Sequence, residues 1–496
     1  MGSAVFLLAI AGFVLYRLSI ILYNVFLHPL RSIPGPWYYA ISWLPKFYHQ
    51  IYKADYWSHI KTLHLKYGPV VRVGPHEVSF CSAKAWDDIY GFKTGGRLEF
   101  PKDATFYDVR NTPLNDSMIS ADKSTHRMLR RQVAPAFSEK ALRAQEPIIK
   151  EYADKFISEM KKRSDKNLDI VDWFTMATAD VMADLSTGES LYCLEKGKTD
   201  PFVEMILSAS PFIGLIQLFN KLPVTKFFYK MLSSSKGLKT WMATIDIVQQ
   251  KAEKREKMGN DRPDFMSLIW GDDDNRESWT KDKIINFAQL LFFAGSETSA
   301  TTLSVVTFHL LTNPHAYKRL AAELRTIKSD EEITLARLAS MEYLTACIDE
   351  GMRMKPVVAA VIPRVSPPGG DMVDGYFIPE GTTVGIPQWA TSHLSSNFSE
   401  HASYLPERWL KSSASDPRFA EDKKGAFHPF AKGPRDCLGR TFAYGMMRMF
   451  LAKFFWHFDA EIVPEDLDWD QRKDFNSVVF WAKPKMHVKL KQITHS

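Results

Sequence analysis

The chain opens with an apolar run over residues 4–27, in which Arg17 is the one formal charge. A helix of roughly 20 apolar residues or more is long enough to cross a bilayer. A cleaved signal peptide is the alternative, but a basic segment before the run and an obvious small-residue cleavage site are both missing. The pattern therefore predicts one transmembrane helix at this end of the chain.

Charges beside this run predict its orientation. Arg31 and Lys46 follow the run, whereas no Lys or Arg precedes it. Because basic residues concentrate on the cytoplasmic side of a span, we expect a single-pass membrane anchor over residues 1–29. The remaining residues, 30–496, would then face the cytoplasm, tethered to a membrane such as the endoplasmic reticulum.

A second apolar run, residues 284–311, carries one formal charge, Glu297. By hydropathy alone this run also qualifies as a membrane span. A glutamate in the middle of a membrane is costly, which favours a buried core helix instead.

A third pattern follows Cys437. Apolar side chains recur at every fourth position after it, namely at Phe442, Met446, Phe450 and Phe454. This spacing marks one face of a helix and places Cys437 at or just before the first turn. The unpaired N–H groups and the positive dipole end of a helix start stabilise a thiolate.

Composition sets limits on the fold and on the partners. With 496 residues, 45% of them hydrophobic and 13% aromatic, the chain can bury a very large core. No repeat or long linker divides it, which favours one large unit after the anchor. The net charge of +6 is modest and dispersed, so nucleic-acid binding has little support. The four cysteines lie far apart without Cys-x-x-Cys pairing, which argues against a zinc site or a disulfide scaffold.

The residues around Cys437 suit a thiolate-ligated haem. A thiolate ligand pushes electron density through iron toward O–O cleavage. Gly433 permits a tight turn, and Gly439 lets the backbone approach a porphyrin closely. Arg435 can reach a haem propionate, while Phe430 can shield the sulfur from water. A buried free cysteine at a helix start is the alternative, and the number of matched positions in one short loop favours the haem.

The pattern Phe-x-x-Gly-x-Arg-x-Cys-x-Gly resembles the proximal loop of the cytochrome P-450 monooxygenases. Further matches over most of the chain make it similar to a full-length member. The wording Pro434-Arg435-Asp436-Cys437 and the run 126–138 are most similar to fungal secondary-metabolism members, the trichothecene-type hydroxylases among them. The resemblance implies a mainly α fold with a smaller β-rich part, heme b (iron protoporphyrin IX) as cofactor, and Cys437 as the axial metal ligand.

The middle of the second apolar run, Ala294-Gly295-Ser296-Glu297-Thr298, resembles the distal helix of these enzymes. The resemblance implies that Gly295 leaves room for dioxygen. It also implies that Thr298 and Glu297 are catalytic and relay protons to the reacting oxygen. Thr298 can bond back to the Ala294 carbonyl and open the helix locally. A buried threonine that only caps its own helix is the alternative.

Cations stand where the family holds the haem propionates, namely at His126, Arg130, Arg364 and Arg435. His126 and Arg130 lie one turn apart on a predicted helix. His126 departs from the family pattern, which has Trp at this position, although its ring can still donate a hydrogen bond.

Glu350 and Arg353 are three residues apart and so share one helix face. Together with Arg408 they resemble the buried Glu-Arg-Arg cluster that braces the cysteine loop in the family. An exposed Glu/Arg pair at helical spacing is the ordinary alternative and is worth little.

Electrons must come from another protein, because the sequence has no Gly-x-Gly-x-x-Gly motif and no complete phosphate loop. The resemblance implies NADPH as the source through a separate cytochrome P-450 reductase, with a cytochrome b-type protein as an alternative donor. Five cations are predicted to dock an acidic flavoprotein, although a solvated basic face is the alternative. They are Arg127, Arg131, Lys140, Lys432 and Arg448.

Stretches that resemble the substrate-facing parts of the family are rich in Phe, Val, Ile and Leu, which predicts a small, lipophilic, uncharged substrate. They are residues 106–119, 205–219, 287–293, 357–362 and 475–480. The sequence therefore predicts a haem-thiolate monooxygenase that inserts one oxygen atom of O2 by hydroxylation, epoxidation or multistep oxidation. The alternatives are a haem-thiolate isomerase or dehydratase, and a non-enzymatic haem sensor or carrier.

Overall fold

The computed structural model describes most of the chain. The described residues are 2–107, 117–208, 210–221, 250–251, 253–255, 257–259, 262–270, 281–359, 361–477 and 480–495. Parts of the predicted substrate-facing stretches lie outside them, namely residues 108–116, 209, 360 and 478–479.

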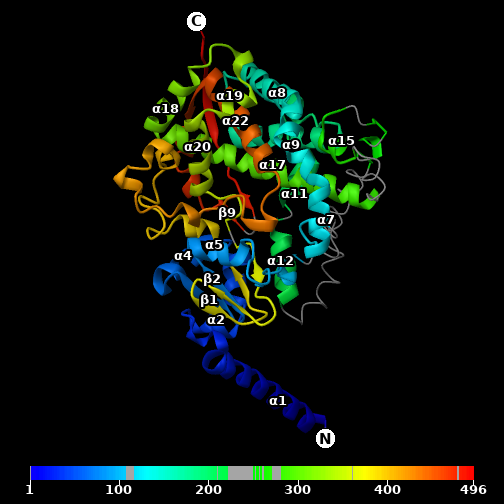
Figure 1. The fold of residues 1–496 in the computed structure, drawn as a ribbon, viewed down its shortest axis with the longest axis vertical. Helices are drawn as coiled ribbons and strands as arrows, with labels where there is room; N and C mark the ends of the chain where they lie inside the picture. Colours follow the sequence, from blue (N-terminus) through cyan, green and yellow to red (C-terminus); the bar gives the residue numbers. More distant parts are fainter. Residues whose placement is uncertain are drawn as a thin grey trace.

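The apolar N-terminal run forms a helix that projects from the body of the molecule (Figure 1). Helix α1 (Gly2–Leu22) continues into a π-helical turn, η1 (Tyr23–Leu27). The span Ser3–Leu27 has a mean hydropathy of 2.4 and is not buried against the rest of the chain. Within the described part of the chain it is the one helix that is long and apolar enough to cross a membrane, as predicted.

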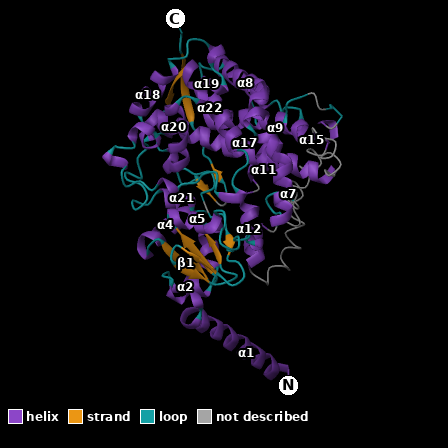
Figure 2. Ribbon diagram, viewed as in Figure 1, coloured by secondary structure: helices purple, strands orange, loops and turns teal. Residues whose placement is uncertain are grey.

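The largest sheet lies close to the foot of α1 (Figure 2). Its strand order is β1 (Val70–Gly74), β2 (Glu77–Phe80), β7 (Thr383–Gly385) and β4 (Arg364–Val365). Strand β2 is antiparallel to β1 and parallel to β7, while β4 pairs antiparallel with β7. Arg364 lies opposite Val384, so the sheet edge fixes the position of a predicted site residue.

Three smaller sheets complete the described β structure. The first joins β3 (Leu168–Asp169), β11 (His487–Gln492) and β8 (Phe458–Ile462), the second β5 (Asp371–Val373) and β6 (Tyr376–Ile378), and the third β9 (Asn476–Ser477) and β10 (Trp481–Ala482).

Helices make up most of the body. The longer ones are α4 (Tyr56–Tyr67), α7 (Lys123–Val133), α8 (Glu139–Lys162), α9 (Ile170–Thr187), α12 (Ser210–Lys221), α17 (Lys281–Thr312), α18 (Pro314–Leu324), α20 (Glu342–Met354) and α22 (Arg440–His457). The shorter ones are α2 (Trp37–Ile41), α3 (Leu44–Phe47), α5 (Ala83–Tyr90), α6 (Ala104–Tyr107), α10 (Cys193–Lys196), α11 (Pro201–Ser208), α15 (Phe265–Trp270), α19 (Leu335–Ala339) and α21 (Gln388–Ser392). The predicted mainly helical fold with a smaller β-rich part is confirmed.

Helix starts show why these elements form where they do. The Asp122 carboxylate accepts a hydrogen bond from the backbone N–H of Thr125 at 2.7 Å and so caps α7. Ser138 caps α8 in the same way, accepting from Ala141 at 3.2 Å. Such caps satisfy N–H groups that a helix start leaves without partners. The cap at Asp122 also fixes the register of α7, which carries two predicted site residues.

Helix α17 is the central helix of the body (Figure 1). It packs against α9, α20 and α22, and its residues Leu303 and Val306 are fully buried. The second apolar run is therefore a core helix. A Cβ atom at Gly295 would overlap with the Met182 side chain of α9, so glycine permits close packing of these two helices.

Candidate active site

Backbone hydrogen bonding and one glycine shape the loop before Cys437. The backbone N–H of Cys437 donates to the Phe430 carbonyl at 2.8 Å. Gly433 has φ +80° and begins a short 3-10 turn, η11 (Gly433–Arg435). A Cβ atom there would overlap with the carbonyl oxygen of Tyr90. The tight turn expected at Gly433 is present, and both its backbone angle and its surroundings require glycine.

Cys437 stands two residues before Gly439, the N-cap of α22. The apolar residues predicted on one face of this helix are all buried, namely Phe442, Met446, Phe450 and Phe454. Cys437 is exposed, whereas the other three free cysteines, Cys81, Cys193 and Cys347, are buried. The accessible thiol is thus the one at the start of the helix.

The surroundings of the Cys437 thiol act on its pKa in both directions. Desolvation by the neighbouring protein atoms raises this pKa, although the residue is open to solvent, while the backbone N–H of Gly439 lowers it. A coordinating metal ion deprotonates a thiol outright. The thiolate form predicted for Cys437 is therefore the form that a bound metal ion would stabilise.

Phe430 contacts Cys437 through the backbone, and the shielding of the sulfur by its ring stays a prediction. The Phe430 ring packs 5.2 Å from the Tyr444 ring, with the Arg440 guanidinium 5.6 Å from its centroid. A Cβ atom at Gly439 would meet Cys437 Sγ at 4.0 Å, an ordinary contact. The protein alone would therefore tolerate a side chain at Gly439, and its expected close approach to a porphyrin stays a prediction.

A group of cations shares one region beside the cysteine loop. Its members are Lys102, His126, Arg364 and Arg435. Burial, with Arg435 and Arg364 nearby, lowers the pKa of Lys102 to about 6. Burial and the same neighbours, with Lys102, lower the pKa of His126 to about 4. Arg364 Nη1 is buried with no hydrogen-bond partner among the described residues.

This region suits an anionic group. Desolvation and the neighbouring positive charges disfavour the charged forms of Lys102 and His126, so an anion in this space would stabilise them. His126 and Arg435 also line an open cavity, so a ligand can reach them. The carboxylates of a haem satisfy both conditions, and the residues present therefore fit the cofactor implied by the cysteine loop.

Arg130 contacts the cysteine loop itself. Its Nη1 donates to the Asp436 carbonyl at 2.7 Å, and its Nη2 pairs with Asp436 Oδ1 at 2.6 Å. Two parallel contacts from one guanidinium give a well-oriented bond. In this structure Arg130 therefore orients the residue next to Cys437, and its contact with a propionate stays a prediction.

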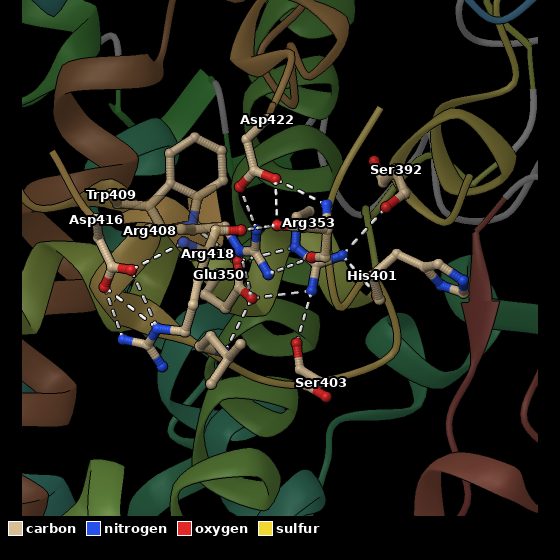
Figure 3. Close-up of polar contacts among 12 residues, drawn as sticks. Glu350, Arg353, Ser392, His401, Ser403, Arg408, Trp409, Asp416, Arg418 and Asp422 are labelled. Carbon is tan, nitrogen blue, oxygen red and sulfur yellow. Dashed lines mark hydrogen bonds and ion pairs between the residues drawn. The ribbon is translucent and has the colours of Figure 1, made fainter. Parts of the chain in front are cut away.

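The predicted Glu-Arg-Arg cluster is formed and fully buried (Figure 3). Glu350 accepts two hydrogen bonds from the Arg353 guanidinium, each at 2.8 Å, and one from Arg408 Nε at 3.1 Å. Trp409 Nε1 also donates to Glu350, at 2.8 Å. Arg408 in turn pairs with Asp422. Each buried charge thus has a partner, and the cluster ties α20 to the loops that precede the cysteine.

The two predicted catalytic residues on α17, Thr298 and Glu297, bind different partners. The Thr298 hydroxyl donates to the Ala294 carbonyl at 2.6 Å, as the sequence suggested. Helix α17 is assigned without a break through these residues, and the expected local opening of the helix stays a prediction. The Glu297 carboxylate is buried and pairs with Lys483 and Thr301. Its role in proton transfer stays a prediction.

Three contributors to the site escaped the sequence analysis: Lys102, Asp436 and Lys483. Lys102 and Lys483 stand in no motif, and their partners are far away in the sequence. Asp436 lies inside the recognised cysteine loop. Its carboxylate directly precedes Cys437, and this position could have indicated a partner for Arg130.

Comparisons with known proteins agree with this geometry. A family model for cytochrome P450 matches residues 33–490. Cytochrome P450 monooxygenase aclL of Aspergillus oryzae is 36% identical, and the alignment covers 98% of this chain and 98% of that protein. Cytochrome P450 monooxygenase efuB of Hormonema carpetanum is also 36% identical, over 97% and 95% of the two chains. Averantin hydroxylase of Dothistroma septosporum is 33% identical, over 98% and 91%.

A helical fold with an accessible cysteine at a helix start, beside a buried group of cations, is typical of the haem-thiolate class of proteins. The chain belongs to the cytochrome P450 family. The predicted resemblance to fungal members, the fold and the enzyme class, an oxidoreductase that incorporates oxygen, are confirmed. Membership implies a haem with a cysteine thiolate ligand, O2, a small substrate and a redox partner.

Proposed function

We propose that the chain is a haem-thiolate monooxygenase that inserts one oxygen atom of O2 into a small lipophilic metabolite of a fungal secondary-metabolite pathway. The observation that carries the proposal is the accessible Cys437 thiol behind the glycine turn, beside the buried cations. The relatives named as monooxygenases and as a hydroxylase support the same reaction class.

The residues of the chain take separate parts in this proposal. Cys437 would ligate the iron, and a thiolate-ligated haem, when bound, would supply the activation of dioxygen. Arg364, Arg435 and His126 hold the propionates together with Lys102, because these side chains are cationic or can donate hydrogen bonds in one buried region.

Protons reach the distal side through α17. Thr298 holds its hydroxyl proton on the Ala294 carbonyl, one turn back along the helix. Glu297, the next residue along, supplies a carboxylate that can take up and release a proton. A relay of this kind favours oxygen insertion over the isomerase or dehydratase alternative, which needs no protons delivered to oxygen.

Electrons come from NADPH through a separate reductase. Arg127, Arg131 and Lys140 are exposed and suit an acidic docking partner. The other two predicted docking cations are engaged within the protein, since Lys432 pairs with Asp87 and Arg448 donates to Thr345 at 3.0 Å. The docking surface therefore rests on the first three residues.

The membrane arrangement follows from α1. We propose an anchor over residues 1–29 and a monooxygenase domain over residues 30–496 on the cytoplasmic side of the endoplasmic reticulum. The projecting apolar helix supports a single span, and the basic residues that follow it support the orientation.

Product analysis under labelled dioxygen tests the reaction class. The full chain is expressed with a fungal reductase and supplied with lipophilic metabolites of its native pathway, under 18O2 with NADPH. A product that gains one 18O atom, and only when NADPH and reductase are present, is the expected result. A product isomerised or dehydrated without label or reductase would support the alternative enzyme, and haem binding without any turnover would support a sensor or carrier.

A further inference from the structure

We infer that Lys483 is a positioning residue for proton delivery: its ammonium group, from the chain after the β9–β10 hairpin, orients the Glu297 carboxylate. This inference rests on the proposed function, because the orientation of Glu297 affects the reaction only if the chain delivers protons to oxygen.

Lys483, Glu297 and Thr301 form a closed polar triangle. Lys483 Nζ pairs with Glu297 Oε1 and donates to Thr301 Oγ1 at 3.0 Å. The Thr301 hydroxyl donates to the same Glu297 oxygen at 3.1 Å. Two donors on one oxygen fix the rotation of the carboxylate, because turning it would break both bonds.

Burial strongly favours the ion pair between Lys483 and Glu297 over the two separated charges. The Lys483 side chain is 5% exposed and that of Glu297 is 4% exposed. Charged side chains are almost never buried unless they are paired, since water cannot replace a lost partner there. Each of the two charges therefore depends on the other to stay inside the protein.

The second oxygen of Glu297 remains for proton exchange. Oε2 is buried and has no hydrogen-bond partner among the described residues. Thr298 does not orient this carboxylate, because its hydroxyl donates to Ala294. Lys483 and Thr301 are thus the groups that decide where the free oxygen of Glu297 points.

The hairpin that precedes Lys483 is itself fixed against the core. The indole N–H of Trp481 donates to the Pro356 carbonyl at 2.7 Å. The Phe480 ring packs edge-on against Phe293 at 5.0 Å. Phe293 lies one turn before Glu297 on α17, so the hairpin meets one face of the helix twice, at successive turns. This support presets the position of Lys483.

Carbon monoxide provides a probe of the distal side that needs no substrate. In the reduced carbonyl complex the C–O stretching frequency responds to charges near the ligand, so movement of Glu297 changes it. We expect Lys483→Met, which removes the ammonium but keeps a long side chain, to shift or broaden this infrared band. Lys483→Arg, which keeps a donor and a charge, should restore the native band.

A matched control comes from the same segment. Lys485 lies two residues further on and is exposed. Lys485→Met removes the same charge without touching α17 and should leave the band where it is. A change of equal size in this variant would overturn the inference, because it would show a general effect of lost charge.

Lys483→Met alone leaves the buried Glu297 charge without its ion-pair partner and can therefore unfold the protein. A double variant avoids this problem. Removing both charges, with Glu297→Gln and Lys483→Met together, leaves no buried ion without a partner. If Lys483 acts through Glu297, the double variant and Glu297→Gln alone should give the same band and the same yield of product per NADPH. A further change in the double variant would overturn the inference.

The outcome also separates this inference from the proposed function. If the wild-type carbonyl complex lacks the spectrum of a thiolate-ligated haem, the proposed function fails. If that spectrum is present, while Lys483→Met leaves the infrared band and the yield of product per NADPH unchanged, only the role of Lys483 is overturned. The expected result is a shifted band with a several-fold loss of product per NADPH, smaller than the loss of about 100-fold or more that removing the proton-transfer group itself typically causes.

Discussion

Single residues set the geometry of the cysteine loop. Gly433 combines a positive φ with a backbone contact that leaves no space for Cβ, and Arg130 holds the Asp436 next to the ligand position. These constraints act through the backbone, so they do not depend on which substrate binds. Substitutions here test the loop separately from the pocket.

Gly433→Ala should weaken both the fold and haem retention. An alanine must move the loop away from Tyr90 and adopt an unfavourable φ, which costs about 1–3 kcal/mol. The ratio of haem absorbance to protein and the thermal unfolding midpoint measure both effects. Gly425→Ala is the matched control, since a Cβ atom there lies 3.5 Å from Ala83 in an ordinary contact. Equal losses in the two variants would contradict the argument.

Thr298→Ala should uncouple NADPH use from product formation. Loss of a proton-transfer group typically costs about two to four orders of magnitude in rate, although water can replace part of it. The measurement is product and hydrogen peroxide formed per NADPH consumed. We expect more peroxide and less product, with normal haem content. Unchanged coupling would argue against the relay on α17.

At the scale of elements, the sequence predicted the helices that depend on one local segment, but it did not predict contacts between residues far apart in the chain. The helix after Cys437, the core helix α17 and the N-terminal helix follow from spacing and hydropathy within one segment. The pairing of Lys483 with Glu297 joins residues 186 positions apart, which no local pattern encodes. Gly295 allows α17 to pack closely on Met182, a contact between distant residues that the sequence did not indicate, while its expected role in leaving room for dioxygen stays a prediction.

The Glu350 cluster also belongs to this scale, because it joins α20 to the loops before the cysteine (Figure 3). Glu350→Ala should destabilise the fold by about 3–5 kcal/mol, since the buried Arg353 would lose its carboxylate partner and the buried Arg408 would keep only Asp422. The control is Glu139→Ala, which breaks an exposed pair with Arg143 on α8 and should cost less than about 0.5 kcal/mol. Denaturant unfolding of both variants measures the difference. A small loss for Glu350→Ala would show that the cluster is not needed for stability.

At the scale of the whole molecule, the proposed anchor and the proposed docking residues concern how the enzyme meets its partners. The span lies at one end of the fold, beside the largest sheet (Figure 2). The exposed cations Arg127 and Arg131 lie on α7, the helix that also carries Arg130, and the exposed Lys140 lies in the first turn of α8. A reductase that docks there would sit on the cysteine side of the haem.

Reversing these three charges should slow electron delivery without harming the site. With Arg127, Arg131 and Lys140 each changed to Glu, stopped-flow reduction by the reductase should be slower and less sensitive to ionic strength, because exposed charges act mainly on the association rate. Peroxide-driven turnover bypasses the reductase and should survive. Reduction at the native rate in low salt would place the docking site elsewhere.

The identity of the haem ligand is the central claim of this account. The reduced carbonyl complex of the wild-type chain should show the red-shifted Soret band of a thiolate-ligated haem, and Cys437→Ser should lose it together with activity. Substitution of each of the buried cysteines, Cys81, Cys193 and Cys347, should leave the band intact. Retention of the thiolate spectrum in Cys437→Ser would contradict the assignment of the site.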